Sequence, residues 1–193
     1  MFEVRFHGRG GQGVVTAAEL LSLAAFEDGL QAQAFPSFGS ERMGAPVIAF
    51  CRIDEHPIRL REPIAEPDAV VVQDATLLHH VDVFGGLAPD GYVLINSARE
   101  LDELGLEELR TRHRPERLLS VPASEIARRR IGRPIANAAL LGGLTALAGL
   151  TSLDALQAAI AERFGSSTAA EGNRLAAADA YAHVSAHLQA TRA

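Results

Sequence analysis

Strict alternation of apolar and polar residues opens the chain and predicts a strand at Phe2–His7. The next stretch, Gln12–Glu27, is rich in alanine and leucine and predicts a helix. Between them lie four glycines within six residues, Gly8 to Gly13. Because glycine lacks a Cβ, such a loop can turn sharply and bring its N–H groups close to a ligand or to another backbone. At the start of a helix these groups favour phosphate or carboxylate.

The same change between strand-like and helix-like patterns continues along the chain. Further strands are predicted at Gln31–Phe35, Val47–Ile53, Ile58–Leu60, Ala69–Val72, Tyr92–Asn96 and Leu118–Val121. Further helical stretches are predicted at Thr76–Val83, Glu100–His113 (in part), Ser124–Ile131, Asn137–Ala148, Leu153–Phe164 and Thr168–His187. Strands that alternate with helices indicate an α/β fold. We expect one domain over residues 1–193, a three-layer Rossmann-like sandwich with a mostly parallel sheet and a helical segment from about residue 135.

Composition and charge remove several classes of function. The net charge of −6 argues against general binding to nucleic acid. The one cysteine, Cys51, falls within an apolar strand, so it forms no internal disulfide and cannot ligate an iron–sulfur cluster by itself. The apolar stretch Ile135–Leu150 is shorter than the roughly 20 residues that span a bilayer. Together with an N-terminus that lacks the basic start of a signal peptide, these features predict a cytoplasmic protein that does not enter the membrane.

The glycine loop alone leaves three interpretations open. Gly8, Gly10 and Gly13 fit the G-x-G-x-x-G fingerprint of dinucleotide sites. That fingerprint also needs an acidic residue at the end of the second strand, but this strand ends in Phe35-Pro36, and the nearby acids Glu27 and Asp28 fall at the end of the first helix. The loop is therefore an NAD site, a tight packing turn, or a surface that faces a phosphate or a partner.

Five stretches, taken in order, carry a resemblance to a known family. They are Gly8–Gly13 (GRGGQG), Phe38–Val47 (FGSERMGAPV), Pro67–Asp74 (PDAVVVQD), Gly132–Leu144 (GRPIANAALLGGL) and Asn173 in the last predicted helix. The combination resembles the gamma subunit, or gamma domain, of the 2-oxoacid:acceptor oxidoreductases, of the pyruvate:ferredoxin oxidoreductase (pyruvate synthase) type. The resemblance covers essentially the whole chain.

The resemblance implies a subunit of a complex that oxidatively decarboxylates a 2-oxoacid to its acyl-CoA. Thiamine diphosphate, Mg²⁺, iron–sulfur clusters and coenzyme A would be bound on or with other subunits. The implied partners are alpha, beta and delta-type subunits, and ferredoxin or another electron acceptor reached through the complex. The Gly132–Asn137 stretch favours pyruvate, with 2-oxoglutarate, branched-chain 2-oxoacids, indolepyruvate and phenylglyoxylate as alternatives. A second alternative is a stand-alone NAD-binding oxidoreductase. We expect no catalytic residue and no metal ligand in this chain, and no activity of the chain alone.

The residues expected to face coenzyme A or a partner lie in two loops. They are Gly8, Arg9, Gly10, Gly11, Gln12, Gly13 and Arg42. Because ligands gather at the carboxyl ends of parallel strands, Arg42 should share an edge with the glycine loop. Asp74 ends a buried strand at that edge, but it and Asn137 are interpreted first as helix caps. His7 is interpreted as a structural histidine rather than a titrating one.

Overall fold

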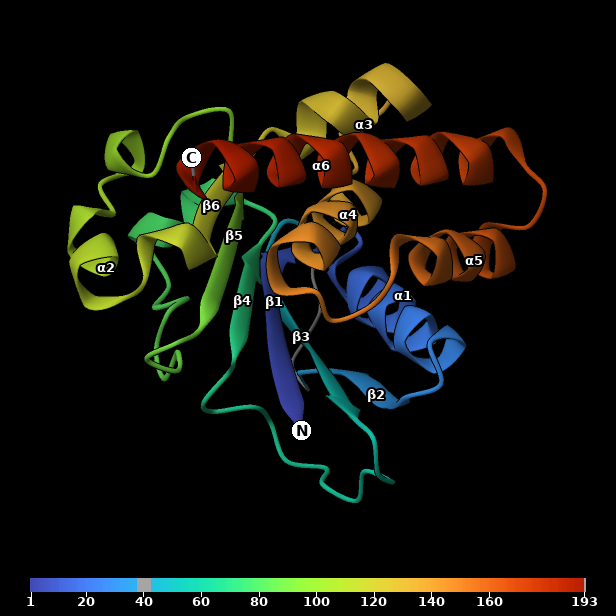
Figure 1. Cartoon of the computed structure of the whole chain (residues 1–193), viewed down its shortest axis with the longest axis horizontal. Coiled ribbons are helices and arrows are strands. Elements are labelled where there is room, and N and C mark those ends of the chain that lie inside the picture. Colours follow the sequence, from blue (N-terminus) through green and yellow to red (C-terminus); the bar gives the residue numbers. More distant parts are fainter. Residues whose placement is uncertain (38–42, 193) are drawn as a thin grey trace.

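The computed structural model describes residues 1–37 and 43–192. Within this part of the chain six strands form one sheet in the order β2-β3-β1-β4-β5-β6 (Figure 1). Their bounds are β1 (Phe2–Arg9), β2 (Gln31–Pro36), β3 (Pro46–Asp54), β4 (Ala69–Val72), β5 (Tyr92–Asn96) and β6 (Leu118–Val121). Strands β1, β4, β5 and β6 pair in parallel, whereas β3 runs antiparallel to both of its neighbours. The expected mostly parallel α/β sheet is confirmed, and β3 is its exception.

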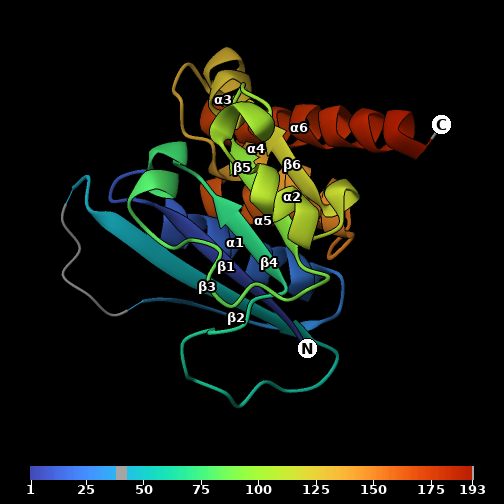
Figure 2. The same ribbon diagram turned by 90° about the vertical axis from the view of Figure 1, so that its left-hand side faces the viewer.

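Helices cover the two faces of the sheet unequally. One face packs against α1 (Val14–Glu27) and α4 (Asn137–Ala148), and beyond them lie α5 (Leu153–Phe164), α6 (Thr168–Arg192) and α3 (Ala123–Ile131). The other face, over β4 to β6, carries only short elements: η1 (Ala75–His79), η2 (Asp102–Leu104), α2 (Glu107–Arg112) and η3 (Pro115–Arg117). Figure 2 shows the end of α6 projecting past the sheet. One outer layer is therefore thick and helical, and the other is thin.

Successive side chains of β1 point alternately to these two faces of the sheet. Val4 and Phe6 are fully buried toward the thick helical layer. Arg5 and His7 point the other way and are also buried. The guanidinium of Arg5 donates to the carbonyls of Val83 (3.0 Å) and Gly85 (2.6 Å), which ties the loops on the thin side to the central strand. A buried cation is tolerable here because backbone carbonyls replace its lost water contacts.

The closest approach between helices occurs where α4 crosses α6. Helix α4 is buried on nearly all sides, as its apolar sequence predicts. At Gly142 a Cβ would collide with the carbonyl oxygen of Ala177 on α6, so only glycine allows this separation. The neighbouring Gly143 is less constrained, because a Cβ there would lie 3.1 Å from Leu94 Cδ2. This crossing fixes where the starts of α4 and α6 lie relative to one another.

Three of the expected elements differ in the structure. The predicted strand Ile58–Leu60 is wrong, because these residues form an irregular loop. The carbonyls of this segment accept hydrogen bonds from Arg52 instead, at Leu60 (3.5 Å) and at Glu62 (2.7 Å). The helix expected at Thr76–Val83 is a shorter 3₁₀ turn, η1, and the last helix runs beyond His187 to Arg192. None of the helices in the described residues has both the length and the apolar character needed to cross a bilayer.

Candidate functional site

The glycine loop begins inside β1, which runs two residues beyond the predicted end to include Gly8 and Arg9, and it ends at the first turn of α1. Gly11 and Gly13 have φ angles of +91° and +75°, a conformation that suits glycine, and Gly13 is the residue from which α1 starts. Gly8 has a different role: a Cβ there would lie 2.6 Å from Val14 Cγ2 and 3.2 Å from Gln73 Cβ. Gly8 is therefore needed for close packing against its neighbours, whereas Gly11 and Gly13 allow the chain to bend sharply before α1. The predicted helix start at Gln12 moves to Val14 for this reason.

Backbone contacts hold the loop against the segment that precedes β3. The N–H of Gly10 donates to the carbonyl of Ala45 at 2.9 Å, and the N–H of Gly44 donates to the carbonyl of Gly10 at 3.2 Å. Met43 forms a parallel bridge with Gly10. Arg42, like the motif residues Phe38 and Glu41, lies outside the described residues. Its placement beside the glycine loop remains a prediction, while Met43, the next residue along the chain, is in contact with the loop.

A network of polar side chains braces the loop from the carboxyl end of β4. Gln12 accepts from the N–H of Arg9 (2.8 Å) and donates to Asp74 (2.8 Å). Arg9 lies 3.3 Å from the same carboxylate and donates to Thr76 Oγ1 and to the carbonyl of Gly44. Asp74 in turn caps η1 by accepting from the N–H of Thr76 at 3.0 Å, so the predicted cap is confirmed. Asp74 therefore serves both the cap and the loop, and Arg9 has protein partners at all three of its nitrogens.

The carboxylate of Asp74 is held in its charged form by these contacts. Its partial burial alone would raise the pKa, since burial disfavours the charged state. The hydrogen bonds from Thr76 and Gln12, together with the charge of Arg9, outweigh this effect and keep the pKa below its ordinary value. The loop therefore rests on a carboxylate that stays ionised at neutral pH.

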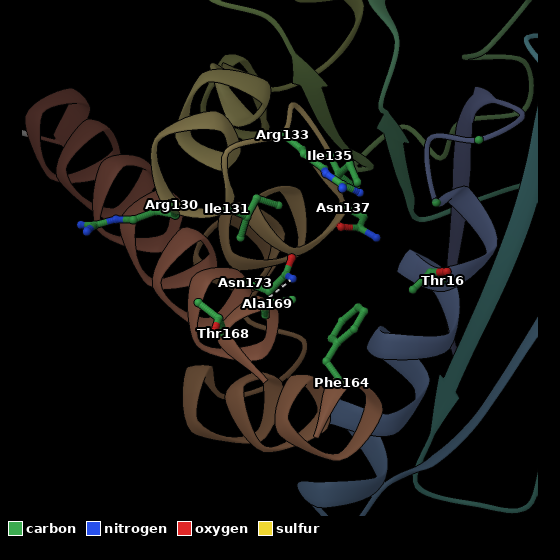
Figure 3. A pocket seen from close by; sticks show the side chains of 12 residues that line it. Thr16, Arg130, Ile131, Arg133, Ile135, Asn137, Phe164, Thr168, Ala169 and Asn173 are labelled. Carbon is green, nitrogen blue, oxygen red and sulfur yellow. Dashed lines mark hydrogen bonds between the residues drawn. The ribbon is translucent and has the colours of Figure 1, made fainter. Parts of the chain in front are cut away.

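A cleft of about 680 Å³ opens on the helical side of the loop (Figure 3). Its lining comes from three parts of the chain that are far apart in sequence: Gly11, Gly13 and Thr16; Arg130, Ile131, Arg133, Ile135 and Asn137; and Phe164, Thr168, Ala169 and Asn173. In Figure 3 the ring of Phe164 points into the space, whereas the guanidinium of Arg130 points away from it. Arg130 is paired with Asp179 at 2.7 Å.

The electrostatic character of this cleft is positive. Helices α1, α4 and α6 all begin at its walls, and the start of a helix carries unpaired N–H groups and a partial positive charge. Arg133 is exposed at its rim. None of the described lining residues is acidic. In a chain with a net charge of −6, this cleft is a local exception that suits phosphate or carboxylate groups.

Two buried asparagines lie at the cleft. Asn137 is 4% exposed, and its Oδ1 accepts from the N–H of the next residue, Ala138, at 2.8 Å. The predicted cap at Asn137 is wrong, because Asn137 is already the first residue of α4, the cap position is Ala136, and no side chain makes a cap hydrogen bond there. Its Nδ2 faces the glycine loop, because a Cβ on Gly13 would lie 2.7 Å from that atom. Asn173 is 6% exposed and donates to the carbonyl of Ala169 at 2.8 Å. The two asparagines of the sequence motifs therefore line the same cleft as Gly11 and Gly13.

A second, smaller hollow of about 270 Å³ lies at the carboxyl ends of the strands. Gln12 lines it from the loop, Gln73 and Asp74 from the end of β4, Asn96 from the end of β5, and Ser124 from the start of α3. Asn96 donates to Ser124 Oγ and accepts from the Ser124 N–H, at 2.8 and 2.9 Å. We call this hollow the Gln73 pocket.

The remaining candidate residues have structural partners. His7 is 2% exposed and accepts from Arg5 Nε at 3.0 Å, which confirms a structural histidine. Cys51 is buried in the core of the thick side. Asp28 is one of the two acids near the position where a dinucleotide site would bind the ribose. It accepts from the N–H and the hydroxyl of Ser152, at 2.6 and 2.7 Å. It lies at the far end of α1, about 20 Å from the glycine loop for a helix of this length.

Several cleft residues carried no signal that single-sequence reasoning could use. Arg133 falls within a motif stretch but has no distinguishing pattern of its own, and Phe164 and Thr168 only mark helix ends. Within the described residues no three His, Cys, Asp or Glu side chains lie together in a way that could hold a metal ion.

This chain is similar to known proteins in both sequence and structure. The family model described as "Pyruvate ferredoxin/flavodoxin oxidoreductase" matches residues 3–183. The "Pyruvate/ketoisovalerate oxidoreductases common subunit gamma" of Pyrococcus abyssi is 49% identical over 181 residues, which cover 94% of this chain and 96% of that one. The crystal structure of pyruvate oxidoreductase subunit PORC from Thermotoga maritima superposes with a TM-score of 0.78 at 35% identity, covering 94% and 95% of the two chains.

A third likeness concerns the fold alone. A structure of 2-oxoglutarate:ferredoxin oxidoreductase from Magnetococcus marinus, with 2-oxoglutarate, coenzyme A and succinyl-CoA bound, has a TM-score of 0.71 at 19% identity. The match covers 96% of this chain and 31% of the longer one. The fold of this chain is therefore also found as one part of the longer 2-oxoglutarate:ferredoxin oxidoreductase chain.

Proposed function

Because the chain belongs to the pyruvate ferredoxin/flavodoxin oxidoreductase family, as a gamma-type subunit, we propose that it acts in a complex that converts pyruvate to acetyl-CoA. The reaction releases carbon dioxide, transfers the acyl group to the thiol of coenzyme A and passes electrons to ferredoxin. Pyruvate is favoured over 2-oxoglutarate, indolepyruvate and phenylglyoxylate by the names of the relatives at 49% and 35% identity. The name of the first also includes ketoisovalerate, so a branched-chain 2-oxoacid is the second candidate substrate. A cytoplasmic location fits a chain with one cysteine, and that cysteine reduced and buried.

The residues of this chain do not fit the redox cofactors of such a complex. An iron–sulfur cluster needs several thiolates, but Cys51 is the only cysteine and it is buried in the sheet. The described residues also offer no group of carboxylates and histidines for the Mg²⁺ that accompanies thiamine diphosphate. We therefore assign the clusters, Mg²⁺ and thiamine diphosphate to alpha, beta and delta-type partner subunits.

Coenzyme A is a different case, because the cleft fits an anionic ligand of that kind. Its volume of about 680 Å³ is within the usual range for small-molecule sites. Arg133 and the starts of α1, α4 and α6 would neutralise the phosphates, and Phe164 supplies apolar surface. The proposed role of this chain is to bind and orient coenzyme A while the acyl group is formed in a partner. The observation that carries the proposal is the convergence of these positive groups on a cleft whose described lining contains no acid.

The test is kinetic and uses the assembled complex. Arg133→Gln removes the charge at the rim, and losing one charge-assisted hydrogen bond should raise the KM for coenzyme A about tenfold, with kcat and the KM for pyruvate little changed. Arg129→Gln is the matched control, since Arg129 is an exposed arginine of α3 that does not line the cleft. Equal KM values for coenzyme A in both variants would refute a role of the cleft. Copurification without thiamine-binding partners would refute the assignment to a complex.

A further inference from the structure

The side chain of Gln73 presents a problem of hydrogen bonding that the proposed function does not explain. Gln73 directly follows β4, and its own N–H donates to the carbonyl of His7 at 2.7 Å. The residue is only 3% exposed. Neither Oε1 nor Nε2 of its carboxamide has a hydrogen-bond partner among the described residues. A buried amide that lacks all partners is costly, and native proteins almost always supply one.

The polar neighbours of Gln73 cannot supply that partner, because they are already paired with one another. The amide of Gln12 is used by the N–H of Arg9 and by Asp74. The amide of Asn96 is used by Ser124 and by the carbonyl of Gln73 itself. Gln73 is thus the one carboxamide of the pocket with a free acceptor and free donors in the described part of the chain.

The composition of the pocket wall selects the charge of what binds. Among the described residues that line the pocket, only Asp74 has an ionisable side chain, and hydrogen bonds hold it in its anionic form. Unlike the cleft, the pocket offers an anion no free positive group among its described lining residues, because the guanidinium of Arg9 is already paired with this carboxylate. A cation would find one carboxylate already neutralised by Arg9 at 3.3 Å. The pocket therefore favours a neutral group.

The position of the pocket in the fold is one where ligands bind in open α/β sheets. From β1 the chain passes through α1 to β2 and β3 on one side of the sheet, and then returns to β4 on the other side. The Gln73 pocket lies at the carboxyl ends of β4 and β5, beside the loop that follows β1. Crevices at such a reversal of strand order are the usual binding sites in this architecture.

We propose that the Gln73 pocket binds a neutral planar group that carries a hydrogen-bond donor and an acceptor side by side. A carboxamide pairs with such a group through its oxygen and its NH₂ together, as it does with another amide or with the edge of an aminopurine. The pocket and the cleft are lined by alternate residues of the same segments: Gln12 lies between Gly11 and Gly13, and Ala136 between Ile135 and Asn137. The two hollows therefore share these segments as walls, and we take the ligand of the pocket to be the one that occupies the cleft. Identifying it with coenzyme A, which contains an adenine and two amides, rests on the proposed function.

The test uses two neutral probes that contain no phosphate, adenosine and pantetheine, titrated calorimetrically into the assembled complex. One of them binds to the wild type, and which one it is tells whether a purine edge or an amide occupies the pocket. Gln73→Met keeps the size of the side chain and removes both polar atoms. We expect it to weaken that probe about tenfold, the effect of losing the paired hydrogen bonds. The melting temperature should not fall, because the lost amide has no protein partner.

Two further variants complete the experiment. Gln33→Met is the matched control: Gln33 on β2 also has a buried, unpaired amide oxygen, but it does not line the pocket, so probe affinity should be unchanged. Gln73→Glu keeps the shape and the acceptor and loses the donor, so it should also weaken the probe. No binding of either probe to the wild type overturns the proposal. The proposal is also overturned if Gln73→Met lowers the melting temperature and leaves the affinity for the probe unchanged, since the amide of Gln73 would then have a structural role. Probe binding that depends on Gln73, combined with a normal KM for coenzyme A in Arg133→Gln, would instead overturn only the proposed function.

Discussion

Acidification should destabilise the folded chain through one residue, His7. The imidazole is 2% exposed on the central strand, and its Nε2 accepts from Arg5 Nε at 3.0 Å. A protonated ring would lose this hydrogen bond and place a second cation beside the buried guanidinium. Burial, and then the charge of Arg5, lowers the pKa of His7 to about 4.

The direction and size of the effect follow from proton linkage. The unfolded chain has a histidine pKa of about 6.5, so between pH 6.5 and pH 4 the unfolded state binds a proton that the folded state does not. The contribution to stability is complete above pH 6.5 and decreases as the pH falls through that value. At pH 5 the loss is about 2 kcal/mol, and its limit below pH 4 is about 3 kcal/mol. For a chain of this length, 2 kcal/mol lowers the melting temperature by about 4–8 °C.

Guanidinium unfolding at pH 7.5, 6 and 5 would measure this effect, with His7→Gln as the diagnostic variant. The Oε1 of glutamine takes the place of Nε2 as acceptor for Arg5 but does not titrate in this range. We expect the stability of His7→Gln to fall by about 2 kcal/mol less than that of the wild type between pH 7.5 and 5. His183→Gln, on the exposed surface of α6, should retain the wild-type dependence. Equal pH dependence in the wild type and His7→Gln would show that His7 protonates normally in the folded chain and would refute the reasoning.

Two further predictions concern single substitutions, both followed by thermal unfolding. Gly142→Ala should cost about 2–3 kcal/mol, because its Cβ meets the backbone of α6, whereas Gly143→Ala meets only the end of Leu94 and should remain within about 1 kcal/mol of the wild type. Equal losses would contradict the close crossing. Asp74→Asn places an NH₂ group against the donors Gln12 and Arg9 and should cost about 1–3 kcal/mol, with faster hydrogen exchange in the glycine loop. An unchanged exchange rate would mean that the loop does not depend on this carboxylate.

The sequence predicted the elements whose pattern depends only on their own residues. Tyr92–Asn96 and Leu118–Val121 were predicted with the bounds that the structure has, because an apolar run in a buried parallel strand is unambiguous. Ile58–Leu60 is predicted as a short return strand only because it follows the turn at residues 54–57. There the carbonyls bond to the guanidinium of Arg52 on β3, a long-range contact that periodicity does not reveal.

The roles of the glycine loop and the cleft also depend on long-range contacts that the sequence pattern does not reveal. The sequence offered packing and ligand binding as alternatives for the loop, whereas Gly8 packs tightly and Gly11 and Gly13 bend the chain beside the cleft. Asn137 and Asn173 could be placed on their helices, but nothing within either helix shows that the two side chains meet at one space. That depends on how α4 crosses α6 at Gly142, and the stretch that contains this glycine does not show which helix it contacts.

The order in which the walls of the cleft occur along the chain has a consequence for biosynthesis. The glycine loop is translated well before the wall formed by Thr168, Ala169 and Asn173. The sheet and the Gln73 pocket need only residues up to about Ala136 and can form earlier. A nascent chain therefore acquires the cleft after the sheet, when α6 docks on α4 and hides its apolar surface. Any partner that recognises the finished cleft thereby selects chains in which α6 has docked.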